Sequence, residues 1–401
     1  MNSLLNLVFD RLEIHGFFNF FIVNANANQL SKSPFIPDDV LNDFTSLSKE
    51  HKVNVCFKSF DPFIDKINED LPMKIQGYNS KMDNENKVKG TRAMDVFREF
   101  ASTTNYAFIS ENLELQEFLF DKLFEWAEDK ALTETKVCYT NIENRFILKE
   151  CEGSWKDPKG QDPAPTHDSS RTLEVIMGLD YLYNFYFINY KKDDLRHKVI
   201  NEWIKPFHKR IKYVTEFTYF GNSAGFFFPN LSIKHSQNKK YKTLVKKLIK
   251  GSDKLLLKDG SIKDRTTRGN RALWYHHSAL GEAFIIMEIA KAANVKLPKN
   301  YEKKLLKAVE LFHDAYLDHS AIEPWAKKKY NSHASNGKQD FRSDFNSTSH
   351  GSAWFHILQY RYPDHRTSKF IKEEMYPRAT SLKSDQILGI SLGCIYNALA
   401  N

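Results

Sequence analysis

The sequence contains few cysteines. Only four occur among 401 residues, and they are widely scattered without a Cys-x-x-Cys pair: Cys56, Cys138, Cys151 and Cys394. This spacing indicates neither a zinc site nor a disulfide framework. We therefore expect no metal and no cofactor.

The sequence also has little uninterrupted apolar character at its N-terminus. The apolar run Phe17 to Val23 is too short to span a bilayer, so we expect no membrane association. The small-x-small pattern that ends at Ala27 is typical of export cleavage sites. We predict a signal peptide or disordered segment at 1–27, with a frayed amphipathic helix as the alternative, and one domain at 28–401. Export implies a periplasmic or secreted protein.

Stretches with alternating apolar and polar residues are scarce, which argues against a large sheet. Apolar residues instead recur at the three-and-four spacing of buried helix faces. The segments with this pattern are 96–101, 115–126, 195–214, 280–290 and 301–316. Helices of this length joined by irregular polar connections predict an all-α fold of paired antiparallel helices in a ring or bundle.

The charge balance is basic, with a formal net charge of +8. It implies an acidic partner, namely nucleic acid, a membrane surface or a polyanionic substrate. The lysines of 239–247 alternate in helical phase with Leu244, Val245 and Leu248, as on a solvated face over a core, so we expect no nucleic-acid partner. A glycoside hydrolase needs two carboxylates flanking the bond, and no such pair stands out.

The most informative segment runs from Asp259 to Val295, DGSIKDRTTRGNRALWYHHSALGEAFIIMEIAKAANV. It sets Arg268 and Tyr275 seven residues apart, about two helical turns. If one helix spans both, a guanidinium that binds a carboxylate lies beside a phenol that exchanges a proton. The alternatives are that Arg268 pairs with Asp264 and that Tyr275 is an ordinary core tyrosine.

Elimination across a uronate ring is a reaction to which this pair of groups is suited. The C5 proton is very weakly acidic until the neighbouring carboxylate is neutralised. Arg268 and the amide of Asn222 are suited to hold that carboxylate and to stabilise the developing enolate. Tyr275 is then placed to accept the C5 proton, to protonate the departing oxygen, or to do both. A phenol ordinarily ionises near pH ~10, and a guanidinium beside it favours the phenolate.

The Asp259 segment resembles the signature of the alginate lyase family, which cuts poly-mannuronate by β-elimination. In that family a DGS-type turn leads to an arginine, and a catalytic tyrosine follows seven residues later; Arg268 and Tyr275 match these positions. Asn222 matches a family asparagine, whereas Ser223 stands where the family has histidine. The resemblance covers about 50–365 and implies an (α/α) toroid that is periplasmic or secreted.

The resemblance leaves the origin of a histidine base open, because a serine hydroxyl has no charge change near neutral pH. His167 is the first candidate for this base and His277 or His350 the next. Tyr275 acting alone is a second possibility, and a non-catalytic polysaccharide binder is a third. The expected substrate is mannuronate-rich alginate, glucuronan or another polyuronate, and we expect a monomer.

Further substrate contacts are expected from the polar connections and from the aromatic residues near them. The loop Gln76 to Lys89 resembles the family lid in its placement, and Trp354 resembles an aromatic residue near the family's C-terminus. The candidate substrate-binding residues are Tyr78, Lys81, Arg171, Ser223, Trp274, His277, His350 and Trp354.

Overall fold

The computed structural model describes most of the chain. The described residues are 30, 32–58, 60–68, 74–75, 84–132, 134–135, 137–142, 145–150, 167–211, 217, 219–221, 228, 231, 235, 237–328, 338–339, 353–375 and 392–400. For 74–75, 84–94, 134–150 and 167–174 the description is limited to the backbone. The predicted signal peptide at 1–27 lies outside these residues.

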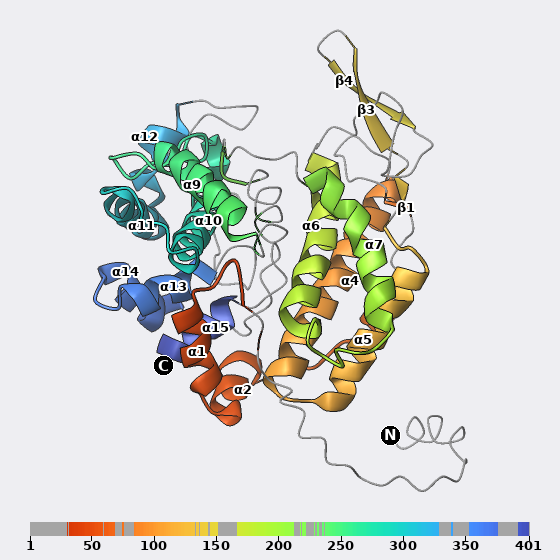
Figure 1. Cartoon of the computed structure of the whole chain (residues 1–401). Helices are drawn as coiled ribbons and strands as arrows, with labels where there is room; N and C mark the ends of the chain where they lie inside the picture. The colour runs from red at the N-terminus through yellow and green to blue at the C-terminus, as the bar shows by residue number, and fades with distance from the viewer. Residues whose placement is uncertain are drawn as a thin grey trace, which may run out of the picture.

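The helices form two groups that stand side by side (Figure 1). One group comprises α1 (Asp38–Ser46), α2 (Lys49–Phe57), α9 (Asn238–Leu255), α10 (Ala272–Ala292), α11 (Tyr301–Leu317), α12 (Glu323–Ala326), α13 (Ala353–Arg361), α14 (Arg366–Phe370) and α15 (Leu392–Ala400). The other comprises α3 (Ile64–Ile67), α4 (Asn84–Ile109), α5 (Leu113–Glu128), α6 (His167–Leu182) and α7 (Arg196–Ile211). Helix α2 contacts both α4 and α15, so it joins the groups.

The strands are short and lie outside the helical body. Strand β1 (Lys74–Ile75) pairs in parallel with β2 (Glu134–Thr135), and β3 (Val137–Ile142) pairs antiparallel with β4 (Arg145–Glu150). Each sheet has two strands. The hairpin projects beyond the upper end of α6 in Figure 1. The predicted absence of a large sheet therefore holds for the described part of the chain.

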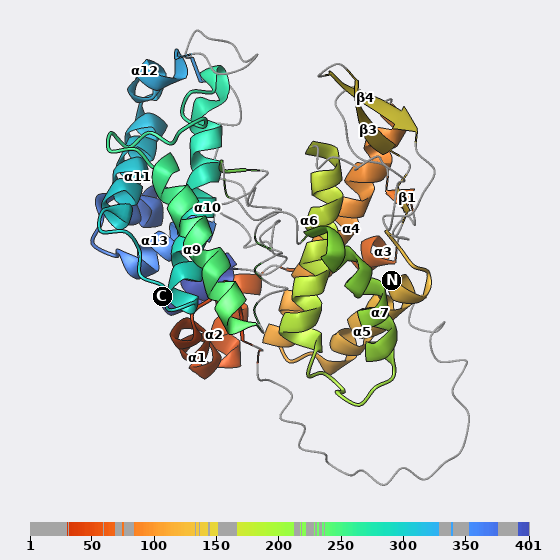
Figure 2. The ribbon, with the colours of Figure 1, turned by 45° about the horizontal axis from the view of Figure 1, so that its top comes forward.

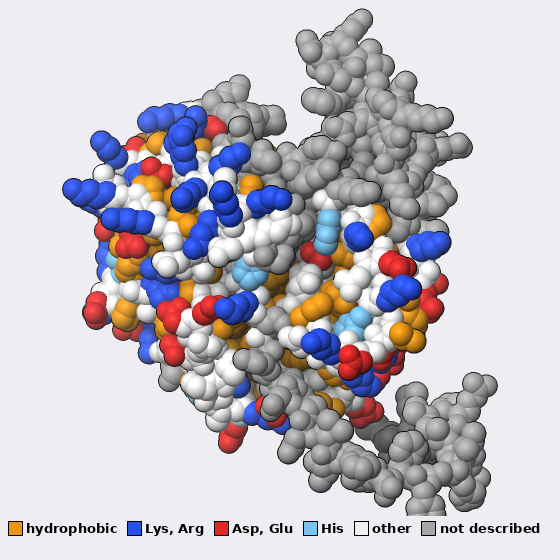
Figure 3. Space-filling view, viewed as in Figure 1, with side chains coloured by type: hydrophobic (Ala, Val, Ile, Leu, Met, Phe, Trp, Pro, Cys, Tyr) orange, Lys and Arg blue, Asp and Glu red, His pale blue; other side chains and the backbone are white. Residues whose placement is uncertain are grey.

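Helix α10 is the central element of its group, flanked by α9, α11 and α13 (Figure 2). Its sequence is apolar nearly all round, and the residues from Ala279 to Ala290 are all buried. A helix without a polar face is more stable in a core than at a surface, because its apolar side chains are then removed from water. Its neighbours are amphipathic instead, as the lysines of α9 show: they are exposed while Leu244, Val245 and Leu248 are buried. In Figure 3 the Lys and Arg side chains gather over this part of the surface.

Several boundaries differ from the sequence predictions. The loop expected at Gln76 to Lys89 is helical from Asn84 onward, where α4 begins. Leu195, expected on a buried stripe, precedes α7 and is 84% exposed. The buried face of α7 is formed by Ile200, Trp203 and Ile204.

A disulfide joins Cys56 of α2 to Cys394 of α15. Both cysteines are buried, and they are separated by 338 residues in the sequence. The expectation that no disulfide is present was therefore wrong. Spacing could not reveal the bond, because the two cysteines meet only after the first and last helices have packed against each other.

Removing this disulfide is expected to destabilise the fold. Because a very long loop is closed, the double variant Cys56→Ser/Cys394→Ser should lose about 2–5 kcal/mol of unfolding free energy. Denaturant unfolding measures the difference, and wild type under reducing conditions should unfold like the double variant. Equal midpoints for oxidised wild type and the double variant would show that the bond contributes nothing.

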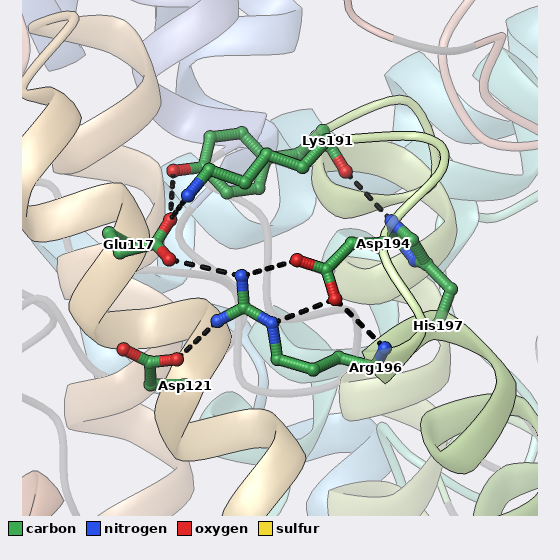
Figure 4. Close-up of polar contacts among 7 residues, drawn as sticks. Glu117, Asp121, Lys191, Asp194, Arg196 and His197 are labelled. Atoms are coloured by element: carbon green, nitrogen blue, oxygen red, sulfur yellow. Dashed lines mark hydrogen bonds and ion pairs between the residues drawn. The ribbon is translucent and has the colours of Figure 1, made fainter. Parts of the chain in front are cut away.

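Helices α5 and α7 are tied together by charges around Arg196 (Figure 4). The guanidinium Nη2 lies 3.0 Å from Oε1 of Glu117 and 2.6 Å from Oδ2 of Asp194, and Nη1 bonds to Asp121. Lys191 Nζ contacts the other oxygen of Glu117 at 2.6 Å. The guanidinium also lies over the ring of Phe120, so the polar contact is backed by packing.

The Arg196 network makes stability depend on pH. Hydrogen bonds from Arg196 lower the pKa of Asp194 from 3.8 to about 2. A carboxylate whose pKa is lowered by folding stabilises the native state above its unfolded pKa and loses that contribution as pH falls through the folded pKa. The stability difference between wild type and Asp194→Asn should therefore be constant near neutral pH and shrink between pH 3.8 and about 2. The control is Asp193→Asn, at a neighbouring exposed carboxylate. A stability difference between wild type and Asp194→Asn that stays the same at every pH would contradict the assignment.

Candidate functional site

The DGS motif builds a tight turn between α9 and α10. Oδ1 of Asp259 accepts hydrogen bonds from the backbone N–H and the hydroxyl of Ser261 at 3.0 and 2.7 Å, and Oδ2 accepts one from Trp325 Nε1 at 3.0 Å. Gly260 has a φ of +86°, and a Cβ there would come within 2.6 Å of the carbonyl oxygen of Lys307. The glycine is therefore required both by the backbone conformation and by the close approach of α11.

A buried histidine fixes the next part of the turn to α10 and α11. The hydroxyl of Thr266 accepts the backbone N–H of Ile262 and lies 2.9 Å from Nδ1 of His276, whose Nε2 donates to the carbonyl of Ala308 at 2.9 Å. Burial lowers the pKa of His276 to about 4. His276 is thus neutral, and both of its ring nitrogens are hydrogen-bonded.

Arg268 lies outside the helix. Helix α10 begins at Ala272, after a 3-10 turn at Gly269–Arg271, so the prediction that one helix carries both Arg268 and Tyr275 was wrong. The cause is Gly269, whose φ of +56° breaks the helical path. The Nε of Arg268 donates to the backbone carbonyl of Asp264 at 2.9 Å. This contact replaces the carboxylate pairing that was the alternative.

The turn nevertheless brings the predicted pair together. The guanidinium carbon of Arg268 lies 4.6 Å from the ring centroid of Tyr275, and both side chains are half-buried. The ring of Trp274 packs edge-on against Tyr275, with 4.7 Å between the centroids. The arrangement is that of a cation over the face of an aromatic ring, in which the ring quadrupole attracts the guanidinium.

Gln339 holds the start of α10, and the sequence analysis did not identify it. Its Oε1 accepts the backbone N–H of Leu273 at 2.9 Å, and its Nε2 donates to the carbonyl of Gly269 at 2.8 Å. The side chain is buried, so it serves as the missing N-terminal cap of α10. No local pattern marks this role, because Gln339 lies 66 residues from the backbone group that it caps.

Two predicted substrate contacts lie in the core instead. Trp354 is 0% and His277 2% exposed, and the indole Nε1 donates to Nδ1 of His277 at 3.2 Å. Trp354 also stacks on Phe284 of α10. In this arrangement neither side chain is available to a polymer, because apolar helices cover both. Trp354 and His277 are therefore not part of the proposed site, and His277 is excluded as the base.

The remaining candidates are placed only in part. His167 and Arg171 lie in the first turns of α6. The first residues of α6 and of α10 lie at the same end of the molecule in Figures 1 and 2. The other candidates lie outside the described residues: Tyr78, Lys81, Asn222, Ser223 and His350.

The turn that directly precedes Asn222 does reach the site. A Cβ on Gly221 would come within 2.7 Å of Nη2 of Arg265, and the φ of Gly221 is +106°. The ring of Tyr219 lies 4.8 Å from the guanidinium carbon of Arg265. The described residues 219–221 therefore pack against Arg265 of the Asp259 segment.

The described residues offer no other obvious functional centre. They contain no group of three or more His, Cys, Asp or Glu residues arranged to hold a metal. Among them no helix combines the length and apolar character needed to cross a membrane. The cluster at the start of α10 is the candidate site.

Comparison with known proteins finds a family model that matches part of the chain. Residues 232–322 match the model of the alginate lyase family. The matched segment contains the DGS turn, Arg268, Tyr275 and the whole of α10. The match is limited to this segment of the chain, and the family that it describes is one of polysaccharide lyases. No curated protein sequence matches the chain.

Solved structures give the same fold. Alginate lyase A1-III from Sphingomonas species A1 is 14% identical, with a TM-score of 0.60 over 91% of this chain and 97% of that chain. A tyrosine-to-phenylalanine variant of A1-III complexed with a tetrasaccharide is 14% identical, with a TM-score of 0.61 over 91% and 96%. A histidine-to-alanine variant with a tetrasaccharide is 13% identical, with a TM-score of 0.59 over 91% and 96%. The all-α, (α/α) toroid prediction is confirmed.

Proposed function

We propose that this protein cleaves a polyuronate, namely alginate rich in mannuronate or a related polymer such as glucuronan, by β-elimination. The observation that carries the proposal is the contact between Arg268 and Tyr275, 4.6 Å from guanidinium carbon to ring centroid, at the start of a buried helix. The family match and the tetrasaccharide complexes of A1-III support it.

The proposed chemistry assigns one role to each side chain. Arg268 binds the C5 carboxylate and neutralises it, which makes the C5 proton more acidic and stabilises the enolate that forms. Asn222 adds a neutral donor to the same carboxylate. The oxygen of Tyr275 removes the C5 proton and passes a proton to the departing glycosidic oxygen when both lie on one side of the ring. The N-terminal end of α10 adds a positive potential to the same region.

In the uronate with the opposite configuration at C5, the C5 proton and the leaving glycosidic oxygen lie on different faces of the sugar. A second base is then needed. We propose His167 for this role, because α6 begins at the same end of the molecule as α10. Tyr275 acting alone limits the enzyme to one epimer. The range of uronates that the enzyme accepts therefore distinguishes the two arrangements.

We also propose that the protein acts in the periplasm or outside the cell. The disulfide between Cys56 and Cys394 supports this location, since such bonds persist in oxidising compartments.

The proposed activity is tested with a panel of polymannuronate, polyguluronate and glucuronan. Elimination creates a C4–C5 double bond that absorbs ultraviolet light, whereas hydrolysis releases reducing ends without this absorbance. Product sizing then separates internal cutting from release at chain ends. Binding without absorbance or reducing ends across the panel would identify a non-catalytic binder and would contradict the proposal.

A further inference from the structure

Arg265 is a buried cation without the usual partners. Its side chain is 4% exposed, and it belongs to the turn between Ile262 and Arg268. Among the described residues its Nε and Nη2 have no hydrogen-bond partner, and no Asp or Glu forms an ion pair with it. Buried polar groups in native proteins are nearly always hydrogen-bonded, so this arginine requires an explanation.

The contacts of Arg265 are with two tyrosine rings. Its guanidinium carbon lies 4.8 Å from the ring centroid of Tyr219 and 5.4 Å from that of Tyr275. Arg268 lies over the same Tyr275 ring at 4.6 Å. The proposed proton-transferring phenol is therefore in contact with two guanidinium groups.

The backbone around Arg265 leaves room for this arrangement. Gly221 adopts a φ of +106° and approaches Nη2 so closely that any Cβ would lie 2.7 Å away. A glycine is needed there both for its conformation and for the space that the guanidinium occupies. Tyr219 and Gly221 thus both pack directly against the guanidinium of Arg265.

Stability alone does not account for this residue. A buried charge without hydrogen bonds costs free energy, and an apolar side chain of similar size would avoid that cost. Burial lowers the pKa of Arg265, while the negative charge of Glu282 raises it. Glu282 lies two turns along α10 from Tyr275 and acts electrostatically, and arginine keeps its charge in such surroundings.

We propose that Arg265 is a positioning residue of the lyase site, which holds the Tyr275 ring and keeps a second fixed positive charge beside its phenol. The proposal rests on the proposed function and deepens it. Arg268 then binds the sugar carboxylate, while the buried Arg265 stabilises the anionic form of the phenol through every cycle. A positive charge near an ionising group favours its anion, and more so where water is excluded.

Among the described residues, the charged groups that the electrostatics and ring contacts place near Tyr275 come from its own segment and from α10. Arg268 and Arg265 face its ring from the turn, and Glu282 lies further along α10. His276 bonds to Thr266 and Ala308, and His277 bonds to Trp354, so both are directed elsewhere. Removing the charge of Arg265 therefore removes a cation that contacts the ring of Tyr275 and leaves Arg268 in place.

The test compares Arg265→Met, which removes the charge at similar volume, with Arg265→Lys, which retains it. The phenolate of Tyr275 is followed by its ultraviolet absorbance, as the difference between each protein and its Tyr275→Phe counterpart. In Arg265→Met the phenolate should appear about 1 pH unit higher than in wild type, and in Arg265→Lys near the wild-type pH. The pH profile of kcat should move in the same direction, and kcat at neutral pH should fall about tenfold.

Two results would overturn the inference. One is an unchanged phenolate titration in Arg265→Met. The other is an equal shift in Arg265→Lys and Arg265→Met, which would assign the effect to packing. Arg366→Met is the matched control, because Arg366 pairs with Asp314 at the surface and should leave both readouts unchanged. Should Arg265→Met fail to fold, Arg265→Gln replaces it with the same expected shift.

The titration needs no substrate, so it separates this inference from the proposed function. A wild-type protein that cleaves no polyuronate would contradict the lyase activity, yet a shifted phenolate in Arg265→Met would still support the electrostatic role of Arg265. A fully active Arg265→Met with an unshifted titration would contradict the role of Arg265 and leave the lyase activity intact.

Discussion

Tyr275→Phe is expected to lower kcat by about 10²–10⁴-fold, because the variant lacks the oxygen that transfers the proton and keeps the ring. The ring contacts with Arg268 and Trp274 remain possible, so the fold and the affinity for polymer should change little. The measurement is the rate of ultraviolet absorbance increase on the preferred polyuronate, together with the dissociation constant of an oligosaccharide.

Tyr360→Phe is the matched control for this change. The ring of Tyr360 also lies under a guanidinium, that of Arg361 at 4.9 Å, but on α13 and among core helices. It should retain wild-type turnover. Equal losses of binding and turnover in Tyr275→Phe, with a lowered unfolding temperature, would instead describe a structural tyrosine.

Arg268→Ala is expected to lower kcat/KM by about 10²–10³-fold, which is the usual cost of losing one donor to a developing anion. The substitution should change both KM and kcat. KM rises because the carboxylate loses its partner, and kcat falls because the enolate carries more charge than the ground state. Arg268→Lys should recover part of kcat, since an ammonium restores the charge and lacks the planar fork.

Lys263→Ala is the control for Arg268→Ala, since Lys263 is an exposed cation of the same turn. It should change turnover little and alter only the dependence of KM on salt concentration, as expected for a screened surface charge. Wild-type turnover in Arg268→Ala would exclude this residue from the site. A proportionate loss in Lys263→Ala would show that the turn contributes only general positive potential.

The helical body could be predicted from the sequence because each buried helix face repeats locally. The stripes at 96–101, 115–126 and 280–290 lie on α4, α5 and α10, as expected. The prediction for 195–214 was wrong at its first residue, because Leu195 fits the helical spacing of a buried face but is exposed. Periodicity states which residues are able to share a face; packing of neighbouring helices decides which of them are buried.

The candidate site could be predicted only where its residues are close in sequence. Arg268 and Tyr275 were paired through an assumed helix, and the structure pairs them through a turn at Gly269. Arg265, in the same segment, was overlooked because its unusual burial comes from Tyr219 and Gly221, which belong to another segment.

The sequence by itself determined the all-α class, the DGS turn and the arginine and tyrosine that follow it, since helical spacing, turn chemistry and a short motif are local properties. Only the tertiary structure decided that Cys56 meets Cys394, that Gln339 caps α10 and that Trp354 is buried. Each of these depends on segments that are distant in the chain. Their contact energies arise only when the helices pack, so no spacing along the sequence encodes them.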